Sequence, residues 1–232
     1  MSKGNGKSLK WVGTRPIRPD GVDKVTGRAK FGADTYKAGM LTGAVLRSPH
    51  AHARIKSIDT SKAAALQGVK AIVTGADFPE LSSEFIPAGE MMVNYRDMSL
   101  NIIARNKVLY DGHAIAAVAT TSASIAEEAL TLIKVDYEVL PHVIDVVEAM
   151  EPGAPILHDD LFTDGVDPKP TKASNVAKRI EIKIGDVEDG FAKADVVLER
   201  EYNTQPVHQG YIELHACTAS VSEDGYAELW CS

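Results

Sequence analysis

The stretch QPVHQGYIELHAC, residues 205–217, concentrates polar side chains that could serve a bound cofactor. The polar members are Gln205, His208, Gln209, Glu213 and His215. The residues between them are apolar and typical of a strand. A polar group buried there needs a partner, because an unsatisfied one costs about 1–3 kcal/mol. The pattern fits a cofactor cavity and a satisfied domain interface equally well.

A second candidate is the histidine pair in SPHAHARI, His50 and His52. Side chains two apart on a strand project from the same face, as paired metal ligands can. No third ligand lies in register with them. The spacing therefore favours turn and packing histidines over a metal site.

A third candidate is Asp111-Gly112-His113, directly before the apolar strand pattern of residues 115–120. Histidine titrates near neutral pH, so His113 could act as a general acid or base. No nucleophile or orienting carboxylate lies nearby in sequence, and this favours a turn stabilised by Asp and Gly. The chain also lacks a Ser-His-Asp signature, a P-loop and a GxGxxG motif.

Cys217 and Cys231 are the only two cysteines of the chain. They cannot supply the four thiolates of an iron–sulfur cluster or a structural zinc site. A hairpin with the three-residue loop Glu223-Asp224-Gly225 would place them directly opposite each other, which permits a disulfide. In a reducing cytosol, two half-buried thiols are the favoured interpretation.

Composition limits the classes of function. The 232 residues are 44% hydrophobic and 25% charged, with a formal charge of −7, so they can bury a core. The interspersed charges argue against nucleic-acid binding, which needs a basic surface. No apolar run has the length of a membrane span, and the first residues lack a secretory h-region. We expect a cytoplasmic protein that binds neither nucleic acid nor membrane.

The elements that must position these residues alternate in type. Apolar and β-branched runs predict strands over 41–48, 53–58, 69–75, 115–120 and 133–141. Asp59-Thr60-Ser61 and Ser122 are potential N-caps of helices that precede the third and fifth of these strands. Residues 77–106 read as irregular. The predicted fold class is α+β.

Four parts follow along the chain: an N-terminal arm (1–20), a first globular unit (21–147), a connector rich in proline and glycine (148–178), and a second unit (179–232). In the second unit we predict strands over 179–186 and 195–204, a short helix over 186–194, and a C-terminal hairpin. Some 50 residues seldom bury enough surface to stand alone, so the second unit reads as incomplete.

Five stretches together carry a family resemblance: residues 20–34, 41–55, 110–120, 135–141 and 208–217. They resemble the molybdenum hydroxylases of the xanthine dehydrogenase and aldehyde oxidase family, at the start of the large, molybdopterin-binding subunit. The alpha subunit of 4-hydroxybenzoyl-CoA reductase is the most similar type. The resemblance implies an α/β hammerhead domain, followed by the incomplete start of a molybdopterin-binding domain.

The resemblance also implies chemistry that lies outside this chain. In the complete enzyme a molybdenum–molybdopterin cofactor hydroxylates aromatic, heteroaromatic or aldehyde carbons, or removes a ring hydroxyl, while partner subunits carry [2Fe-2S] clusters and FAD. The glutamine beside the metal, a Gly-Gly-Phe-Gly loop and the glutamate base are expected after Ser232. No catalytic residue is therefore assigned. Gln209, Glu213 and His215 are expected to face the cofactor domain, and Leu214 stands where relatives often have proline.

Two functions compete. The favoured one is a scaffold that docks the rest of the large subunit, the iron–sulfur subunit and the FAD subunit. The alternative is a stand-alone binding or assembly module that retains the hammerhead fold. The strand edge at residues 226–232 discriminates between them, because a self-sufficient module is expected to protect such an edge with charge or proline.

Overall fold

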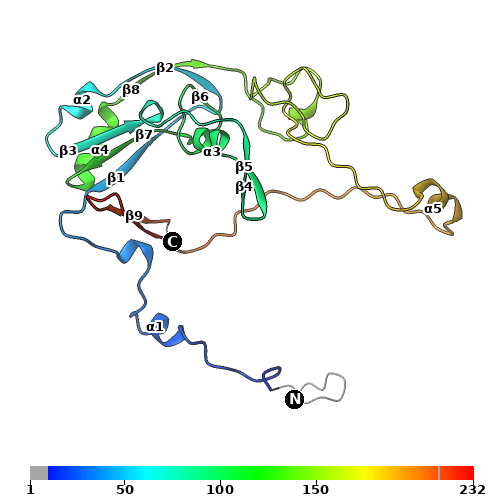
Figure 1. Ribbon diagram of the computed structural model, residues 1–232, viewed down its shortest axis with the longest axis horizontal. Coiled ribbons are helices and arrows are strands. Elements are labelled where there is room, and N and C mark those ends of the chain that lie inside the picture. The colour runs from blue at the N-terminus through cyan, green and yellow to red at the C-terminus, as the bar shows by residue number, and fades with distance from the viewer. Residues whose placement is uncertain (1–9, 214) are drawn as a thin grey trace. The chain divides into compact units, whose positions relative to one another are not determined.

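The structure is a computed structural model that describes residues 10–213 and 215–232. The chain divides into two compact units, one formed by Leu41–Glu199 and the other by Met1–Met40 with Arg200–Ser232. Figure 1 labels most of the helices and strands of both units. None of the helices formed by the described residues combines the length and apolarity needed to cross a bilayer.

Two antiparallel sheets form the centre of the larger unit. In one, β7 (Ala114–Thr120) lies between β1 (Thr42–Arg47) and β3 (Val69–Thr74). In the other, β2 (Ala53–Asp59) lies between β6 (Lys107–Val108) and β8 (Lys134–Val139). The predicted strands 41–48, 53–58, 69–75, 115–120 and 133–141 are thus confirmed with small shifts at their ends.

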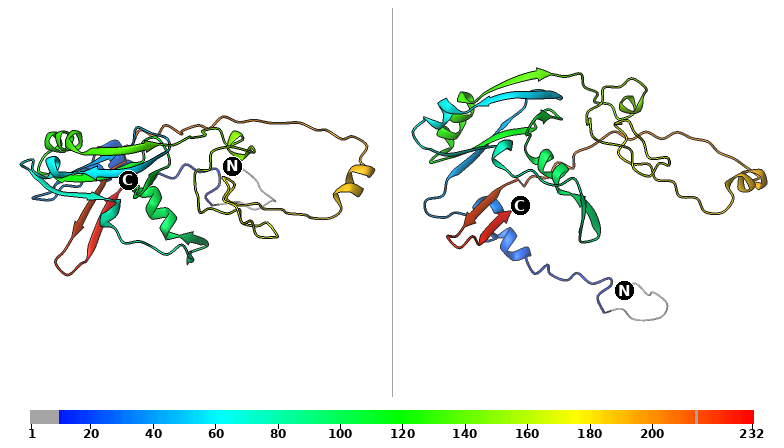
Figure 2. Two further views of the ribbon diagram at one scale, coloured as in Figure 1. Left: turned by 90° about the horizontal axis from the view of Figure 1, so that it is seen from above. Right: turned by 45° about the horizontal axis from the view of Figure 1, so that its top comes forward.

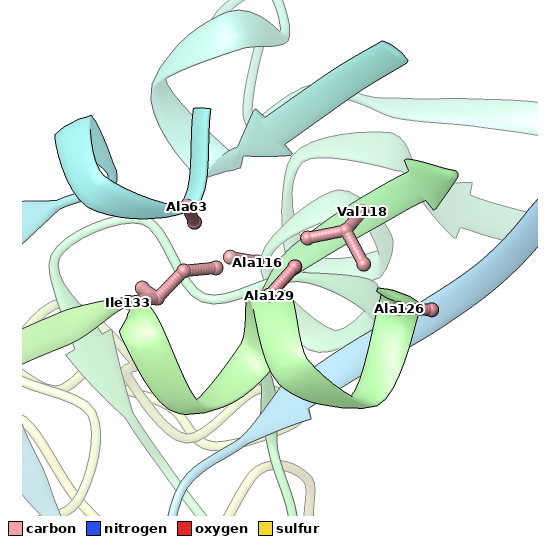
Figure 3. Packing of buried hydrophobic residues seen from close by; sticks show 6 residues of the cluster. All are labelled: Ala63, Ala116, Val118, Ala126, Ala129 and Ile133. Atoms are coloured by element: carbon pink, nitrogen blue, oxygen red, sulfur yellow. The ribbon is translucent and has the colours of Figure 1, made fainter. Parts of the chain in front are cut away.

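Helix α4 (Ala123–Leu132) covers the β7 sheet together with the short helix α2 (Ser61–Ala64). The predicted cap of α4 is present, because the Ser122 hydroxyl accepts the Ile125 N–H. Small side chains let helix and strand approach closely in the core cluster, which Figure 3 shows: Ala63, Ala116, Val118, Ala126, Ala129 and Ile133. Burying one Val or Ile side chain stabilises such a core by roughly 1.5–3 kcal/mol.

Residues 77–106 contain regular structure, so their prediction as irregular is wrong. After the 3-10 turn η2 (Gly75–Asp77), strands β4 (Phe85–Ala88) and β5 (Met91–Asn94) form a hairpin, and helix α3 (Tyr95–Ile102) follows directly. The strands are only four residues long and β4 contains proline, which weakens their sequence signal. The helix signal was present, because Asn94 accepts the Asp97 N–H as an N-cap.

The connector continues as irregular chain after the 3-10 turn η3 (Glu148–Met150). Beyond it, the predicted short helix is confirmed as α5 (Val187–Lys193). The predicted strands 179–186 and 195–204 are wrong: both stretches are irregular in the described chain. A strand is stabilised by its ladder, and neither stretch has a ladder partner among the described residues.

The smaller unit contains α1 (Gly21–Val25), the 3-10 turn η1 (Gly32–Asp34) and the hairpin of β9 (Cys217–Val221) and β10 (Ala227–Cys231). Figure 2 draws this hairpin in orange and red. Its loop is the predicted Glu223-Asp224-Gly225, and Gly225 adopts the left-handed φ of +85° that a three-residue hairpin loop requires. Turn η1 packs against both strands of the hairpin.

Candidate functional site

Residues 205–213 and 215 are exposed, irregular chain in the smaller unit, so the strand that their apolar residues indicated is wrong for these positions. The aromatic rings of this segment form a continuous row. The His208 Nδ1 accepts the Gly210 N–H at 3.0 Å, and the His208 ring lies 5.0 Å from the ring of Tyr211. Tyr211 in turn contacts the Nε2 of His215 through its hydroxyl, with the ring centroids 4.9 Å apart. The structure therefore groups His208 and His215 through Tyr211.

Tyr211 was missed by reasoning from polar residues alone, although its position between the two histidines was a usable signal. Gln209 and Glu213, in contrast, are exposed and make no hydrogen bond or ion pair with the described residues. The segment thus brings His215, but not Gln209 or Glu213, into a defined set of contacts. Leu214, which stands where proline was expected, lies outside the described residues.

His50 and His52 make unrelated contacts. His52 is only 4% exposed, and its Nδ1 lies 2.6 Å from the carbonyl oxygen of Pro141, so this nitrogen donates the hydrogen bond. The ring of His50 packs edge-on against Tyr137, with centroids 4.9 Å apart. Burial raises the pKa of the Tyr137 hydroxyl. These contacts support the packing role that the spacing favoured.

The Asp111-Gly112-His113 stretch is a structural turn. The Gly112 N–H donates to the Ser48 carbonyl at 2.8 Å, and an Arg47 Nη1 donates to the Gly112 carbonyl at 2.9 Å. His113 is fully buried and stacks on Tyr110, with ring centroids 4.3 Å apart. A side chain without solvent access cannot exchange protons with a substrate in solution, so the turn interpretation is confirmed.

A pocket of about 190 Å³ in the larger unit was not predicted from the sequence. Its lining includes the guanidinium groups of Arg96 and Arg105. Arg96 contacts Asp160 at 2.5 Å, and this hydrogen bond lowers the pKa of the Asp160 carboxyl. Arg105 contacts Glu80 at 3.3 Å. Both cations therefore have a carboxylate partner, and neither leaves an uncompensated charge to attract an anion.

Comparison with known families identifies two parts of the chain. Residues 26–141 match "Aldehyde oxidase and xanthine dehydrogenase, a/b hammerhead domain", and residues 169–232 match "Molybdopterin cofactor-binding domain". The chain belongs to the aldehyde oxidase and xanthine dehydrogenase family. It corresponds to the N-terminal part of the family's large subunit, with the hammerhead domain and part of the cofactor-binding domain. The α+β fold class is confirmed.

The relatives are large subunits of molybdenum hydroxylases. The carbon monoxide dehydrogenase large chain of Afipia carboxidovorans is 36% identical over 97% of this chain and 27% of its own length. A probable hypoxanthine oxidase of Escherichia coli (strain K12) is 32% identical over 93% of this chain and 25% of its own. The crystal structure of quinoline 2-oxidoreductase from Pseudomonas putida 86 matches with a TM-score of 0.75 and 31% identity, over 94% of this chain and 26% of that chain. The chain thus spans about a quarter of these relatives.

The described residues, 10–213 and 215–232, do not by themselves form an enclosing site for a molybdopterin. A cofactor of that size is normally enclosed by a concave site with a few convergent polar groups. Gln209, Glu213 and His215 are instead exposed on an irregular segment. Two pockets of the larger unit are lined by other residues. No catalytic step is assigned to this chain.

Proposed function

We propose that this chain is the scaffolding and partner-docking part of a molybdenum hydroxylase, an oxidoreductase of aromatic, heteroaromatic or aldehyde substrates. In this proposal the cofactor is held mainly by the remainder of the large subunit. Separate iron–sulfur and FAD subunits carry the electrons, and the assembly is cytoplasmic. The similarity to the alpha subunit of 4-hydroxybenzoyl-CoA reductase, which would add reductive dehydroxylation, remains a prediction from the sequence stretches.

One observation carries the proposal: a strand-like sequence exposes its apolar side chains. Ile180, Ile182 and Ile184 are 72%, 81% and 87% exposed, and they alternate with charged residues as on a half-buried strand. Each such side chain gains roughly 1.5–3 kcal/mol when it is covered. An alternation of this kind is typical of a strand that pairs and packs, so a protein surface is the expected cover.

A second apolar surface adjoins the first in sequence. Helix α5 and the residues after it line a pocket of about 350 Å³ with Val187, Gly190, Phe191, Ala194, Val196, Val197 and Leu198. Phe191 is 58% exposed. Exposed apolar surfaces that are contiguous mark interaction sites more often than single exposed residues do. In this proposal residues 179–232 therefore form the docking part. Residues 148–178 are the connector, residues 21–147 are the hammerhead domain, and residues 1–20 are the N-terminal arm.

In the assembled subunit, we place Gln209, Glu213 and His215 toward the cofactor domain. Their exposure and lack of a closed pocket are what such a position requires before the remaining subunit covers them. A cofactor-facing role predicts that these side chains become protected from solvent only in the assembly.

The alternative of a stand-alone module has one observation in its favour, because the α4 cluster gives the larger unit a core of its own. The exposed edge of strand β10 argues against a stand-alone module. Leu229 is 66% exposed on this edge strand, and residues 226–232 contain no proline and only Glu228 as a charged residue. An edge of this kind invites pairing with another chain.

The test is metal analysis with light scattering on the purified chain. We expect no bound molybdenum and an associated, concentration-dependent species. The substitution Ile182→Lys is expected to reduce the association, whereas Ala177→Lys, which adds the same charge at an exposed connector position, leaves it unchanged. A stable monomer that carries the cofactor would overturn the proposal and favour the stand-alone module.

Co-expression with a polypeptide that supplies the rest of a large subunit gives an independent check. We expect the second polypeptide to remove the association of this chain and to yield a molybdenum-containing complex. Failure of the two polypeptides to copurify would contradict the docking role.

A further inference from the structure

The C-terminal hairpin presents two faces of different character. Side chains alternate along each strand, so Thr218, Ser220, Glu228 and Trp230 share one face and Cys217, Ala219, Val221, Ala227, Leu229 and Cys231 share the other. The first face packs on segment 32–37: Thr218 is 8% exposed, and the Lys37 Nζ lies 4.2 Å from the centroid of Trp230. The cysteines therefore lie on the uncovered face.

The two cysteines occupy the ladder position at which strands approach most closely. Cys217 and Cys231 are direct partners in the register. The Ser232 N–H donates to the Ala216 carbonyl at 3.1 Å, so the neighbouring pair, 216 with 232, is the hydrogen-bonded one. The loop end agrees, because the Ser222 N–H donates to the Tyr226 carbonyl at 2.9 Å. Hydrogen-bonded and non-hydrogen-bonded pairs alternate along an antiparallel ladder, so Cys217 and Cys231 form a non-hydrogen-bonded pair.

This position suits a disulfide bond. In a non-hydrogen-bonded pair the Cα atoms lie about 4.5 Å apart, within the roughly 4.4–6.8 Å that disulfides span. The thiol sulfurs already lie 3.0 Å apart, and both side chains are exposed. The sequence interpretation of half-buried thiols is thus corrected, because the pair is open to solvent and in contact.

We propose that Cys217 and Cys231 are a reversible modification site, which a low-molecular-weight disulfide of the oxidised-glutathione class converts to a cross-strand disulfide. One thiolate attacks the reagent, breaks its S–S bond and releases one reagent thiol. The second cysteine, after losing its proton, attacks the resulting mixed disulfide and releases the other. Two protein thiols and one reagent disulfide thus give one protein disulfide and two reagent thiols. This inference is argued from the hairpin of the isolated chain and does not use the proposed function.

The surroundings of Cys217 disfavour its thiolate. Its hydrogen bond with Cys231 raises the pKa of its thiol, so the thiolate is scarce near neutral pH. The rate of disulfide formation is therefore expected to rise with pH. A dithiol resting state in a reducing compartment, oxidised only when the reagent disulfide accumulates, is consistent with this behaviour.

The test is incubation of the full chain with oxidised glutathione, followed by alkylation and mass spectrometry. We expect loss of both alkylation sites, a mass decrease of two hydrogens, a cross-link between the two cysteine peptides after cleavage at Glu223 and Glu228, a monomer-sized band on non-reducing gels, and reversal by dithiothreitol. Two retained thiols, a stable glutathione adduct or disulfide-linked dimers would each overturn the proposal.

A matched control uses the same face of the hairpin. The double variant Cys231→Ser with Leu229→Cys keeps two thiols but places them at diagonal positions, where the two residues lie about 7–8 Å apart. It is expected to accumulate glutathione adducts at least tenfold over the internal disulfide. Equal internal disulfide formation in this variant would show that the direct pairing has no role.

Discussion

The Nε2–H of His113 donates to the backbone carbonyl of Leu100 at 2.9 Å, which ties the start of β7 to helix α3. The other ring nitrogen, Nδ1, accepts the Leu109 N–H at 3.2 Å. These two bonds fix the neutral tautomer. A residue that reads as a catalytic candidate in the sequence thus holds together the helix and strand around it.

Stability should therefore depend on the protonation of His113. Burial lowers the pKa of the His113 imidazole below its value in the unfolded chain, about 6.5. The unfolded state binds the proton more readily, so the free energy of unfolding falls as pH decreases below about 6.5. His113→Gln should flatten this part of the profile, measured by urea unfolding between about pH 8 and pH 5. An unchanged slope in the variant would contradict the assignment.

Gly75 should not tolerate a side chain. A Cβ at this position would lie 2.5 Å from the Ala104 carbonyl oxygen and 2.7 Å from the Arg105 Cα, and backbone atoms cannot move aside cheaply. Gly75→Ala is expected to lower the free energy of unfolding by about 1–3 kcal/mol. Gly190→Ala, in helix α5 with open space around it, should instead leave the free energy of unfolding unchanged or raise it by up to about 1 kcal/mol. Equal effects of the two substitutions in thermal unfolding would refute this reasoning.

Asn175 should organise the connector. Its Oδ1 accepts the Leu157 N–H at 3.0 Å, and its Nδ2 donates to the carbonyls of Ala149 and Pro155 at 3.0 and 2.9 Å. Asn175→Ala should cost about 1–3 kcal/mol in local stability and remove hydrogen-exchange protection at the Leu157 amide. Asn175→Asp should be worse, because a carboxylate would face both carbonyls. Thr171→Ala, at an exposed position nearby, is the control and should leave the protection unchanged.

Lys37 should shield Trp230. Its ammonium lies over the indole ring and contacts the Glu228 carboxylate at 3.1 Å. Lys37→Ala should cost about 0.5–1 kcal/mol, the scale of an exposed cation–π contact. In a Trp11→Phe background, it should also increase acrylamide quenching of the remaining tryptophan. Lys30→Ala is the control, and a quenching change of equal size there would contradict the contact.

Local sequence signals were sufficient for a correct prediction where a segment makes its hydrogen bonds and turns within itself. The cap at Ser122 and the loop at Gly225 depend on one side-chain oxygen and one left-handed residue, so they are readable from a few neighbouring residues. The cysteine register follows from that loop by counting along two strands.

Prediction from the sequence failed where the structure depends on contacts between residues far apart in the chain. The alternation of Ile180, Ile182 and Ile184 indicates a strand, but the described residues offer it no ladder. The row of His208, Tyr211 and His215 depends on how an irregular segment bends, which no periodicity encodes. The sequence therefore predicted which polar residues belong to the candidate site but not how they are arranged.

The sequence by itself determined the alternating elements, the family and the pairing of Cys217 with Cys231, because these depend on side-chain pattern and short loops. Only the tertiary structure decided that His113 is buried, that residues 85–102 form a hairpin and a helix, and that the cysteine face of the β9–β10 hairpin is exposed. The physical reason is that burial and strand pairing depend on partners far away in the chain, whereas caps, turns and register depend on near neighbours.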